Sequence, residues 1–229
     1  MNLNIGDFIL YMVALVFSLS LHEAGHAWMS SRFGDDLARH HGRISLNPAV
    51  HVDPIGTLLF PALAYFTGQP FLGWARPTPV NPLKWRNKDV ANIWVSAAGV
   101  ICNAFIAIIA GLLMRGLFET GQLSLLMDEY GLMAQARSAS PLAEGAASLL
   151  SILFQMNVGL AIFNLLPIPP LDGSKILGSL LPKSFEAGFE ALERFGFILL
   201  FIAVYAGAFH GIFRVLMPLV SRLFTIGLS

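Results

Sequence analysis

The chain contains SLHEAGH at residues 20–26, inside the first long apolar run of its 229 residues. If this run is an α-helix, His22 and His26 stand four positions apart and both imidazoles leave the same helix face. Glu23 lies about 100° around the helix from His22, where it can reach a metal-bound water but is poorly placed as a ligand. Two imidazole ligands and one carboxylate base are the groups that metal-assisted hydrolysis requires. We therefore predict that His22 and His26 bind a metal ion and that Glu23 is a general base.

The composition indicates an integral membrane protein. Hydrophobic residues make up 55% of the chain and charged residues 12%, and the mean hydropathy is +0.67, whereas about a quarter of a soluble domain is charged. Such a chain could not cover itself with polar surface in water. The 14 basic residues balance the 14 acidic residues, which argues against nucleic acid as a partner. The single cysteine, Cys102, excludes an internal disulfide and a cysteine-based zinc site.

Four apolar segments are long enough to span a membrane, at residues 8–31, 90–117, 146–167 and 195–216. The apolar run at residues 55–67 is short and contains Pro61, so we expect a re-entrant or half-membrane element there. Residues 42–47 alternate between polar and apolar side chains, which predicts a short strand. The predicted fold class is an all-α polytopic membrane protein with four full transmembrane helices, a re-entrant segment and a short cytoplasmic-side β-hairpin or strand.

The distribution of charge predicts the orientation. Residues 32–90 hold seven of the fourteen basic residues, whereas the loop at residues 118–145 holds four acidic residues and one arginine. The positive-inside rule then puts the metal motif near the cytoplasmic face and the N-terminus outside. Because the first span carries the motif, we expect no cleavable signal peptide. We expect one membrane-embedded domain over residues 1–229, with a core at residues 8–181, an additional C-terminal helix at residues 195–216 and no separate sensor module.

A catalytic zinc site needs a third protein ligand, and Asp172 is the acidic residue that fits. It lies in NLLPIPPLDG at residues 164–173, where the third span returns to the membrane side and depth of the two histidines. An aspartate at this place could instead cap a helix at the membrane interface. The pairing with His22 and His26 favours metal binding, because one Zn²⁺ with Asp172 and Glu23 gives a neutral site in an apolar environment.

Together the two motifs resemble the site-2 protease family of intramembrane zinc metalloproteases. HExxH at residues 22–26 and N-x-x-P-x-P-x-L-D-G at residues 164–173 both match that family. The segment GVICN at residues 99–103 resembles the family's G-P-x-x-N element, except that Val100 replaces the proline. The likeness covers residues 8–181 and is to a compact bacterial-type branch without PDZ or CBS modules. It implies a multi-pass protein of a bacterial or archaeal cell membrane.

The resemblance implies a catalytic role for particular residues. One zinc ion would be bound by His22, His26 and Asp172, with Glu23 as the general base. The reaction would be hydrolysis of a peptide bond within or next to a transmembrane segment of a protein substrate, as in regulated intramembrane proteolysis. Asn164 and Asn103 would hold the substrate carbonyl or its oxyanion; the alternative for Asn164 and Asn103 is that they cap or bridge unwound backbone.

The sequence leaves the roles of four other residues undecided, and it leaves two alternative functions, a metal transporter and a non-catalytic scaffold. His51 lies beside the ligands or the substrate, or is a turn residue, and His210 is expected to pack within the last span. Gly207 and Gly211 form a packing face within the chain or between two copies, which leaves a homo-oligomer open. A metal transporter would need several polar sites along a path, and the other spans hold few ionisable groups. A non-catalytic membrane scaffold of the same fold has no need of Glu23.

Overall fold

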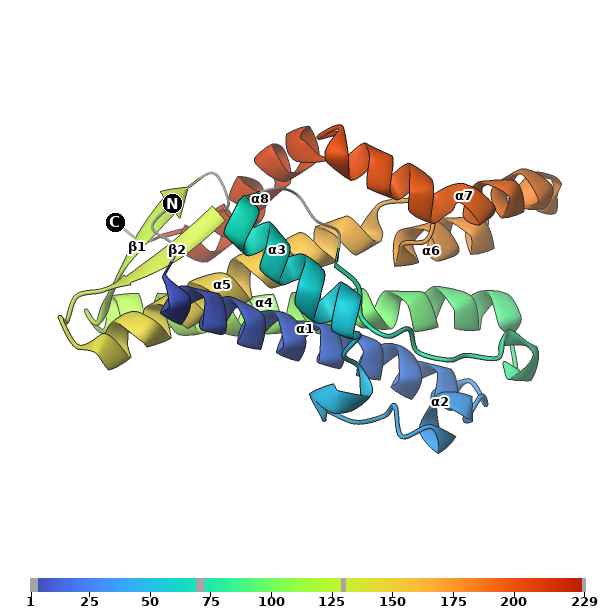
Figure 1. Cartoon of the computed structure of the whole chain (residues 1–229), viewed down its shortest axis with the longest axis horizontal. Coiled ribbons are helices and arrows are strands. Elements are labelled where there is room, and N and C mark those ends of the chain that lie inside the picture. The colour runs from blue at the N-terminus through green and yellow to red at the C-terminus, as the bar shows by residue number, and fades with distance from the viewer. Residues whose placement is uncertain (1–3, 69–72, 129–130, 228–229) are drawn as a thin grey trace.

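The computed structural model describes residues 4–68, 73–128 and 131–227, which form a helical bundle with one small sheet (Figure 1). The strands are β1 (Leu123–Asp128) and β2 (Gly131–Ala136). Short helical turns lie at Pro48–Val50, Pro54–Leu59, Pro82–Lys84 and Lys183–Phe185. The helices are α1 (Ile5–Arg32), α2 (Leu37–His40), α3 (Phe60–Thr67), α4 (Lys88–Glu119), α5 (Pro141–Leu165), α6 (Asp172–Leu180), α7 (Glu186–Tyr205) and α8 (His210–Thr225).

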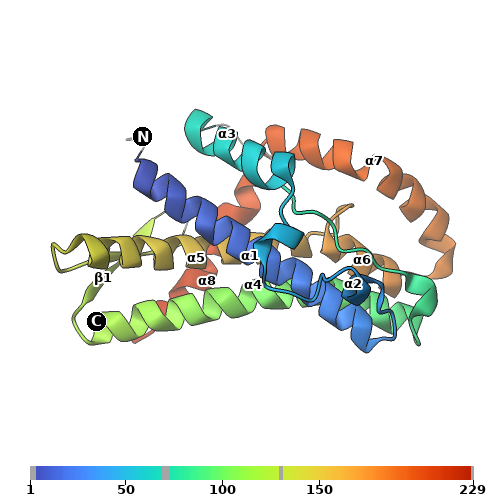
Figure 2. The same cartoon turned by 60° about the horizontal axis from the view of Figure 1, so that its bottom comes forward.

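Helices α1, α4 and α5 are long and apolar enough to cross a membrane, which confirms the first three predicted spans. Side-chain caps define where two of them begin, because Asn4 accepts a hydrogen bond from Gly6 N and Asn87 accepts one from Val90 N. All three helices pack against one another (Figures 1 and 2). The contact between α1 and α4 depends on Gly25, where a Cβ would lie only 2.7 Å from Cys102 Sγ. The missing side chain lets the two backbones approach closely.

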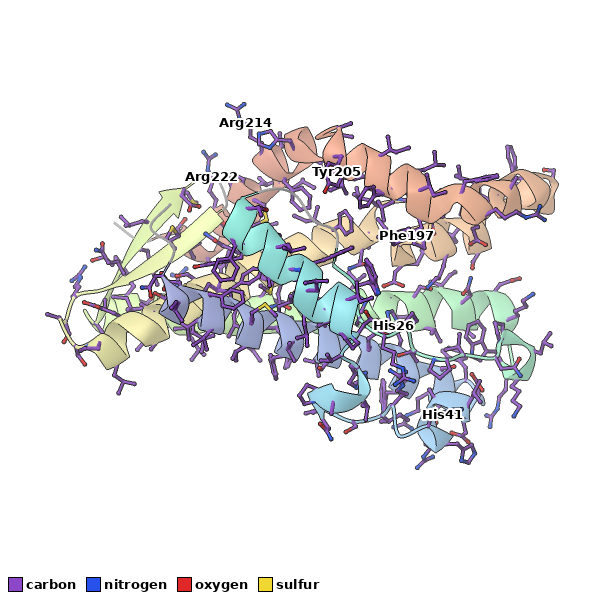
Figure 3. All side chains as sticks on the ribbon, in the orientation of Figure 1. His26, His41, Phe197, Tyr205, Arg214 and Arg222 are labelled. Atoms are coloured by element: carbon purple, nitrogen blue, oxygen red, sulfur yellow. The ribbon has the colours of Figure 1, made fainter. Side chains whose placement is uncertain are left out.

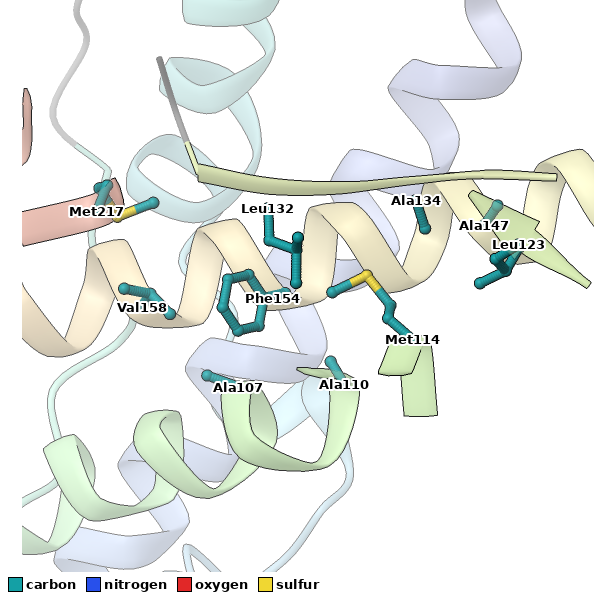
Figure 4. Packing of buried hydrophobic residues seen from close by; sticks show 10 residues of the cluster. All are labelled: Ala107, Ala110, Met114, Leu123, Leu132, Ala134, Ala147, Phe154, Val158 and Met217. Carbon is teal, nitrogen blue, oxygen red and sulfur yellow. The ribbon is translucent and has the colours of Figure 1, made fainter. Parts of the chain in front are cut away.

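A buried apolar cluster joins α4 and α5 to the sheet and to α8 (Figure 4). Phe154 of α5 and Met114 of α4 are fully buried in it, and in helices that cross a membrane such contacts are stabilised by close van der Waals packing rather than by removal from water. The cluster holds the sheet end of the bundle together, away from α2 (Figures 1 and 2). Its members are Ala107, Ala110, Met114, Leu123, Leu132, Ala134, Ala147, Phe154, Val158 and Met217.

The fourth predicted span, at residues 195–216, is not one continuous helix. α7 ends at Tyr205, α8 begins at His210, and the two helices are bent by 78° at the break. Gly207 lies in the break with a φ of +71°, a left-handed conformation that glycine adopts at little cost. The predicted fourth span therefore corresponds to a bent pair of helices, which are together long and apolar enough to count as one span; the sequence does not show the bend because the apolar run continues through it.

The glycine pair in this segment does not form a packing face within the part of the chain that the structure describes. A Cβ on Gly207 or on Gly211 would meet no atom within 4 Å among the residues that the structure describes. The two positions therefore bring no helices together, and the pair gives no support to a homo-oligomer.

The strand predicted at residues 42–47 was also misplaced. Gly42 has a φ of +67°, and Asn47 caps the helical turn that follows by accepting from Ala49 N at 3.1 Å. These local turn preferences override the alternating pattern. The sheet lies instead within the loop at residues 118–145, where β1 and β2 pair antiparallel with Leu123 opposite Ala136. It stands at the far end of the bundle from α2 (Figures 1 and 2).

The apolar helical segment Pro54–Thr67 is too short to span a membrane, as predicted for residues 55–67. Asp53 begins it by accepting hydrogen bonds from Ile55 N and Gly56 N. Gly56 packs so closely against the ring of Trp74 that a Cβ there would collide with the indole. This contact directs the chain from residue 74 back towards α1 as an extended segment.

Candidate metal centre

Two histidines of α1 and the first residue of α6 converge at one point in the bundle. His22 Nε2 lies 3.0 Å from His26 Nε2, and Asp172 Oδ2 lies 3.2 Å from each of these nitrogens. All three residues are buried, with 5–8% of their surface exposed. Figure 3 shows His26 within the molecule, whereas His41 lies at the periphery beside α2. The structure therefore brings together the three residues that the two motifs singled out.

Hydrogen bonds through Nδ1 orient both imidazoles. His26 Nδ1 lies 2.6 Å from the carbonyl oxygen of Val95, and His22 Nδ1 lies 2.6 Å from Asn103 Oδ1. Both oxygens accept, so each Nδ1 carries the proton and each Nε2 carries a lone pair. Asp172 Oδ2, which faces these lone pairs, is a buried oxygen without a hydrogen-bond partner among the described residues. Three electron pairs that face one another at such distances repel unless a cation lies among them, so the donor set fits zinc.

The backbone of α4 lies against the two imidazoles at Gly99. A Cβ at this position would lie 2.5 Å from His26 Nε2 and 2.6 Å from His22 Nε2. Only a residue without a side chain leaves this space open. Val100, which replaces a proline in the family pattern, is buried within α4, and the helix continues through it. The replacement therefore leaves the approach of Gly99 intact.

A tight turn after α5 delivers Asp172 to the histidines. α5 ends at Leu165, and a Cβ on Gly173 would collide with the carbonyl oxygen of Leu165. Glycine is therefore needed for the chain to fold back and begin α6 at Asp172. Lys175, one turn further, places Nζ 3.4 Å from Asp172 Oδ1. The two carboxylate oxygens thus face different groups, Oδ1 the lysine and Oδ2 the histidines.

Glu23 is held by Thr78, a residue that the sequence motifs do not include. Thr78 N donates to Glu23 Oε2 at 2.9 Å, and Thr78 Oγ1 lies 2.7 Å from the same oxygen. Ligand atoms of His22, Glu23 and His26 all lie within 4.8 Å of one another. Asp172 is the better candidate for the third ligand, because its Oδ2 lies 3.2 Å from both Nε2 atoms and has no hydrogen-bond partner among the described residues. The only sequence signal for Thr78 is its place between two prolines, Pro77 and Pro79, which favours extended backbone.

The two candidate asparagines have different surroundings. Asn103 is fully buried, accepts from His22 through Oδ1 and donates to Asn157 Oδ1 through Nδ2 at 2.8 Å. It does not line the cavity beside the histidines, so its expected contact with a substrate is not supported. Asn164 is half-buried and lines this cavity, and its Nδ2 donates to Leu160 O at 3.0 Å.

A cavity of about 1230 Å³ lies beside the cluster. Trp74 and Phe197 lie in its wall, with ring centroids 5.6 Å apart and an edge-to-face arrangement, and Figure 3 labels Phe197 on α7. His51 is not part of the wall, because its ring is buried and its Nε2 bonds to Ser45 O at 2.8 Å. The cavity is mostly apolar, and its wall includes Tyr11, His22, Glu23, Phe163, Asn164, Asp172, Phe189 and Phe197.

The chain is similar to known metalloproteases over most of its length. A family model for peptidase family M50 matches residues 10–203, a range that includes both motifs. YwhC of Bacillus subtilis, named as a candidate zinc metalloprotease, is 36% identical over 191 residues, which cover 83% of this chain and 78% of that protein. Two proteins named Rip2, also candidate zinc metalloproteases, come from Mycolicibacterium smegmatis and Mycobacterium tuberculosis. The first is 28% identical over 207 residues (90% of this chain, 70% of that protein), and the second 26% over 208 residues (91% and 71%).

No solved structure gives a significant match to the chain. The family match covers most of the sequence, the relatives share the zinc-metalloprotease name, and three or four segments are able to cross a membrane. The chain therefore belongs to peptidase family M50, the site-2 protease family of membrane metalloproteases.

Proposed function

We propose that the chain is an intramembrane zinc endopeptidase. It hydrolyses a peptide bond within or next to a transmembrane segment of a membrane protein, in regulated intramembrane proteolysis. The observation that carries this proposal is the convergence of His22, His26 and Asp172, with Glu23 alongside, in the wall of a cavity between apolar helices. Membership of peptidase family M50 supports the same reaction.

In this proposal one zinc ion is held by Nε2 of His22, Nε2 of His26 and Oδ2 of Asp172. Bound zinc supplies Lewis-acid chemistry, which polarises the substrate carbonyl and makes water a nucleophile at neutral pH. The charges of Asp172 and Glu23 balance those of the ion, as an apolar environment requires. The Nδ1 hydrogen bonds keep both imidazoles in the tautomer that metal binding needs.

Glu23 is the general base. Both contacts of Thr78 with the carboxylate of Glu23 are to Oε2, so we assign proton transfer to Oε1. This oxygen takes the proton of the attacking water and returns it to the amide nitrogen of the departing peptide. A glutamine at this position would keep the shape of the side chain but could not accept the proton.

The substrate binds in the cavity as an extended segment. A transmembrane helix hides its peptide bonds in i→i−4 hydrogen bonds, so it must unwind before water can attack. The wall of the cavity holds Asn164, whose amide we assign to the oxyanion after it releases Leu160 O. The excess of basic residues at positions 32–90 supports a site near the cytoplasmic face and an N-terminus outside.

The experiment compares wild type with Glu23→Gln in the purified full-length chain. We measure bound zinc by elemental analysis and cleavage of a candidate transmembrane substrate in detergent and in proteoliposomes. Wild type should bind one zinc and cleave, whereas Glu23→Gln should bind zinc equally and fail to cleave. A wild type without zinc, or a Glu23→Gln variant that cleaves normally, would overturn the proposal. Metal flux through proteoliposomes that survives in Glu23→Gln would point to a transporter instead.

A further inference from the structure

We propose that Asn157 of α5 is a positioning residue for the metal centre. It fixes the direction of the Asn103 amide and, through it, the tautomer of His22. This keeps the lone pair of His22 Nε2 facing Asp172 and His26. The inference rests on the proposed role of His22 as a zinc ligand, and it adds two residues, Asn157 and Ser18, that lie outside the family motifs.

A continuous chain of hydrogen bonds links these residues across three helices. His22 Nδ1 bonds to Asn103 Oδ1 at 2.6 Å, and Asn103 Nδ2 donates to Asn157 Oδ1 at 2.8 Å. Asn157 Nδ2 donates to Ser18 Oγ and to Leu153 O, both at 2.8 Å. Asn103, Asn157 and Ser18 are each 0% exposed. These side chains therefore have no contact with solvent, and each of their polar atoms must form its hydrogen bonds with other groups of the protein.

One backbone carbonyl, that of Leu153, decides which atom donates and which accepts in every one of these hydrogen bonds. Leu153 O can only accept a hydrogen bond, so the Asn157 atom beside it must be the amide nitrogen. Asn157 Oδ1 then points towards Asn103, so Asn103 must donate to it through its amide nitrogen. Asn103 Oδ1 is left to face His22, and His22 Nδ1 must carry the proton. His22 Nε2 consequently has a lone pair.

Ser18 strengthens the same direction. Its hydroxyl donates to Ala14 O at 2.7 Å, so the oxygen accepts from Asn157 Nδ2 rather than donating to it. Asn157 Nδ2 therefore meets two acceptors, Ser18 Oγ and Leu153 O, and a reversed Asn157 amide would set its oxygen against a carbonyl. Because Leu153 O alone is sufficient to fix the direction, Asn157 matters more than Ser18.

Without Asn157, both orientations of the Asn103 amide become available. In the reversed orientation Asn103 Nδ2 faces His22 Nδ1, which must then accept and lose its proton. The proton of His22 then sits on Nε2, where it blocks the lone pair that a metal needs. The substitution Asn103→Asp would remove this ambiguity, because both oxygens of a carboxylate accept hydrogen bonds and either orientation keeps the proton on His22 Nδ1.

The experiment uses the purified full-length chain in detergent, with Asn157→Leu, with the double variant Asn157→Leu/Asn103→Asp and with wild type. Zinc affinity is measured by competition with a chelator. The tautomer of His22 is measured on metal-free, ¹⁵N-histidine-labelled protein by NMR. The zinc affinity of Asn157→Leu should fall by about tenfold, the lower end of the effect of removing groups that hydrogen-bond to metal ligands. The NMR spectrum of this variant should show a signal for His22 with the proton on Nε2. The double variant should regain most of the affinity.

The matched control is Ser151→Ala, which removes another buried hydrogen-bonding side chain from α5. Ser151 Oγ bonds to Ala134 N and Ala147 O at the sheet end, so this variant should lower the melting temperature without changing zinc affinity. Asn157→Ser, which is too short to reach Asn103, replaces Asn157→Leu if the leucine variant does not fold.

Two outcomes would overturn the inference. One is an Asn157 variant with wild-type zinc affinity and Nδ1–H signal for His22. The other is a double variant that loses as much affinity as Asn157→Leu, because that would mean that Asn157 only packs. If wild type binds no zinc, the proposed function fails, and the tautomer measurement still tests the role of Asn157.

Discussion

Thr78 contacts one carboxylate oxygen of Glu23 through its backbone amide at 2.9 Å and its hydroxyl at 2.7 Å, and the same hydroxyl lies 3.0 Å from the backbone carbonyl oxygen of Glu23. The bonds come from the extended segment that follows Trp74 and passes alongside α1. Asn81 N donates to the buried carboxylate of Asp35 at 2.7 Å and so ties the same segment to the end of α1. The position of the proposed base is thus set by a loop that lies 55 residues further along the chain.

The first prediction concerns Thr78→Val, which removes the hydroxyl but keeps the size of the side chain and the backbone N–H. Loss of one hydrogen bond to a charged group costs about 1.5–3 kcal/mol, which corresponds to roughly a tenfold to hundredfold fall in kcat. Zinc content should not change, because Thr78 contacts none of the proposed ligands. Thr78→Ser keeps the hydroxyl and serves as the control. A Thr78→Val enzyme with normal kcat would show that the backbone bond alone positions Glu23.

The second prediction concerns Gly99→Ala. The added methyl group would lie within 2.6 Å of Nε2 of both His22 and His26, so the imidazoles must move and most of the bound zinc should be lost. Gly116→Ala is the matched control on the same helix, because a Cβ there meets no atom within 4 Å among the described residues. That control should keep its zinc and gain about 0.5–1 kcal/mol in stability. Zinc analysis and melting temperatures test both variants, and full zinc content in Gly99→Ala would contradict the close approach of α4.

Much of the fold could be predicted because apolar length and motif spacing are local properties of the sequence. The three spans that became α1, α4 and α5 are long and uninterrupted, so their length alone identifies them. The break between α7 and α8 could not be predicted in this way, because Gly207 and its neighbours keep the segment apolar. The strand at residues 42–47 failed for a related reason, since the capping by Asn47 outweighs a short alternating pattern.

The candidate site was predictable only where it consists of motifs. His22, Glu23 and His26 are linked by helical spacing, and Asp172 by its motif, whereas Thr78 reaches Glu23 only through the path of the loop. Asn157 did carry a signal, because a polar side chain in an apolar span needs a buried partner. Its partner could not be named from sequence, since the register between α4 and α5 decides which residue it meets.

The third prediction separates the two oxygens of Asp172. Asp172→Asn keeps the shape but replaces the charged oxygen that faces both histidines, so zinc affinity should fall by at least about a hundredfold, because neutral amides are poor ligands for zinc. Lys175→Met removes only the group beside Oδ1, and because the lysine side chain is about half exposed, its loss should change affinity by less than about tenfold. Chelator competition measures both. Equal losses in the two variants would mean that Asp172 acts through Lys175 rather than as a ligand.

The last prediction concerns removal of the metal. His22 and His26 belong to α1 and Asp172 begins α6, so an ion among them joins two parts of the chain that are 146 residues apart. At a free zinc concentration of a thousand times Kd, binding to the folded state alone should stabilise it by about 4.1 kcal/mol. A chelator should therefore lower the melting temperature of wild type and of Glu23→Gln equally, since Glu23 is not a ligand. Asp172→Asn, which should bind zinc at least about a hundredfold more weakly, keeps at most about 1.4 kcal/mol of this stabilisation at the same zinc concentration, so its melting temperature should fall much less. An Asp172→Asn variant as sensitive to the chelator as wild type would place the metal elsewhere, because without the carboxylate the two imidazoles alone make a weak site.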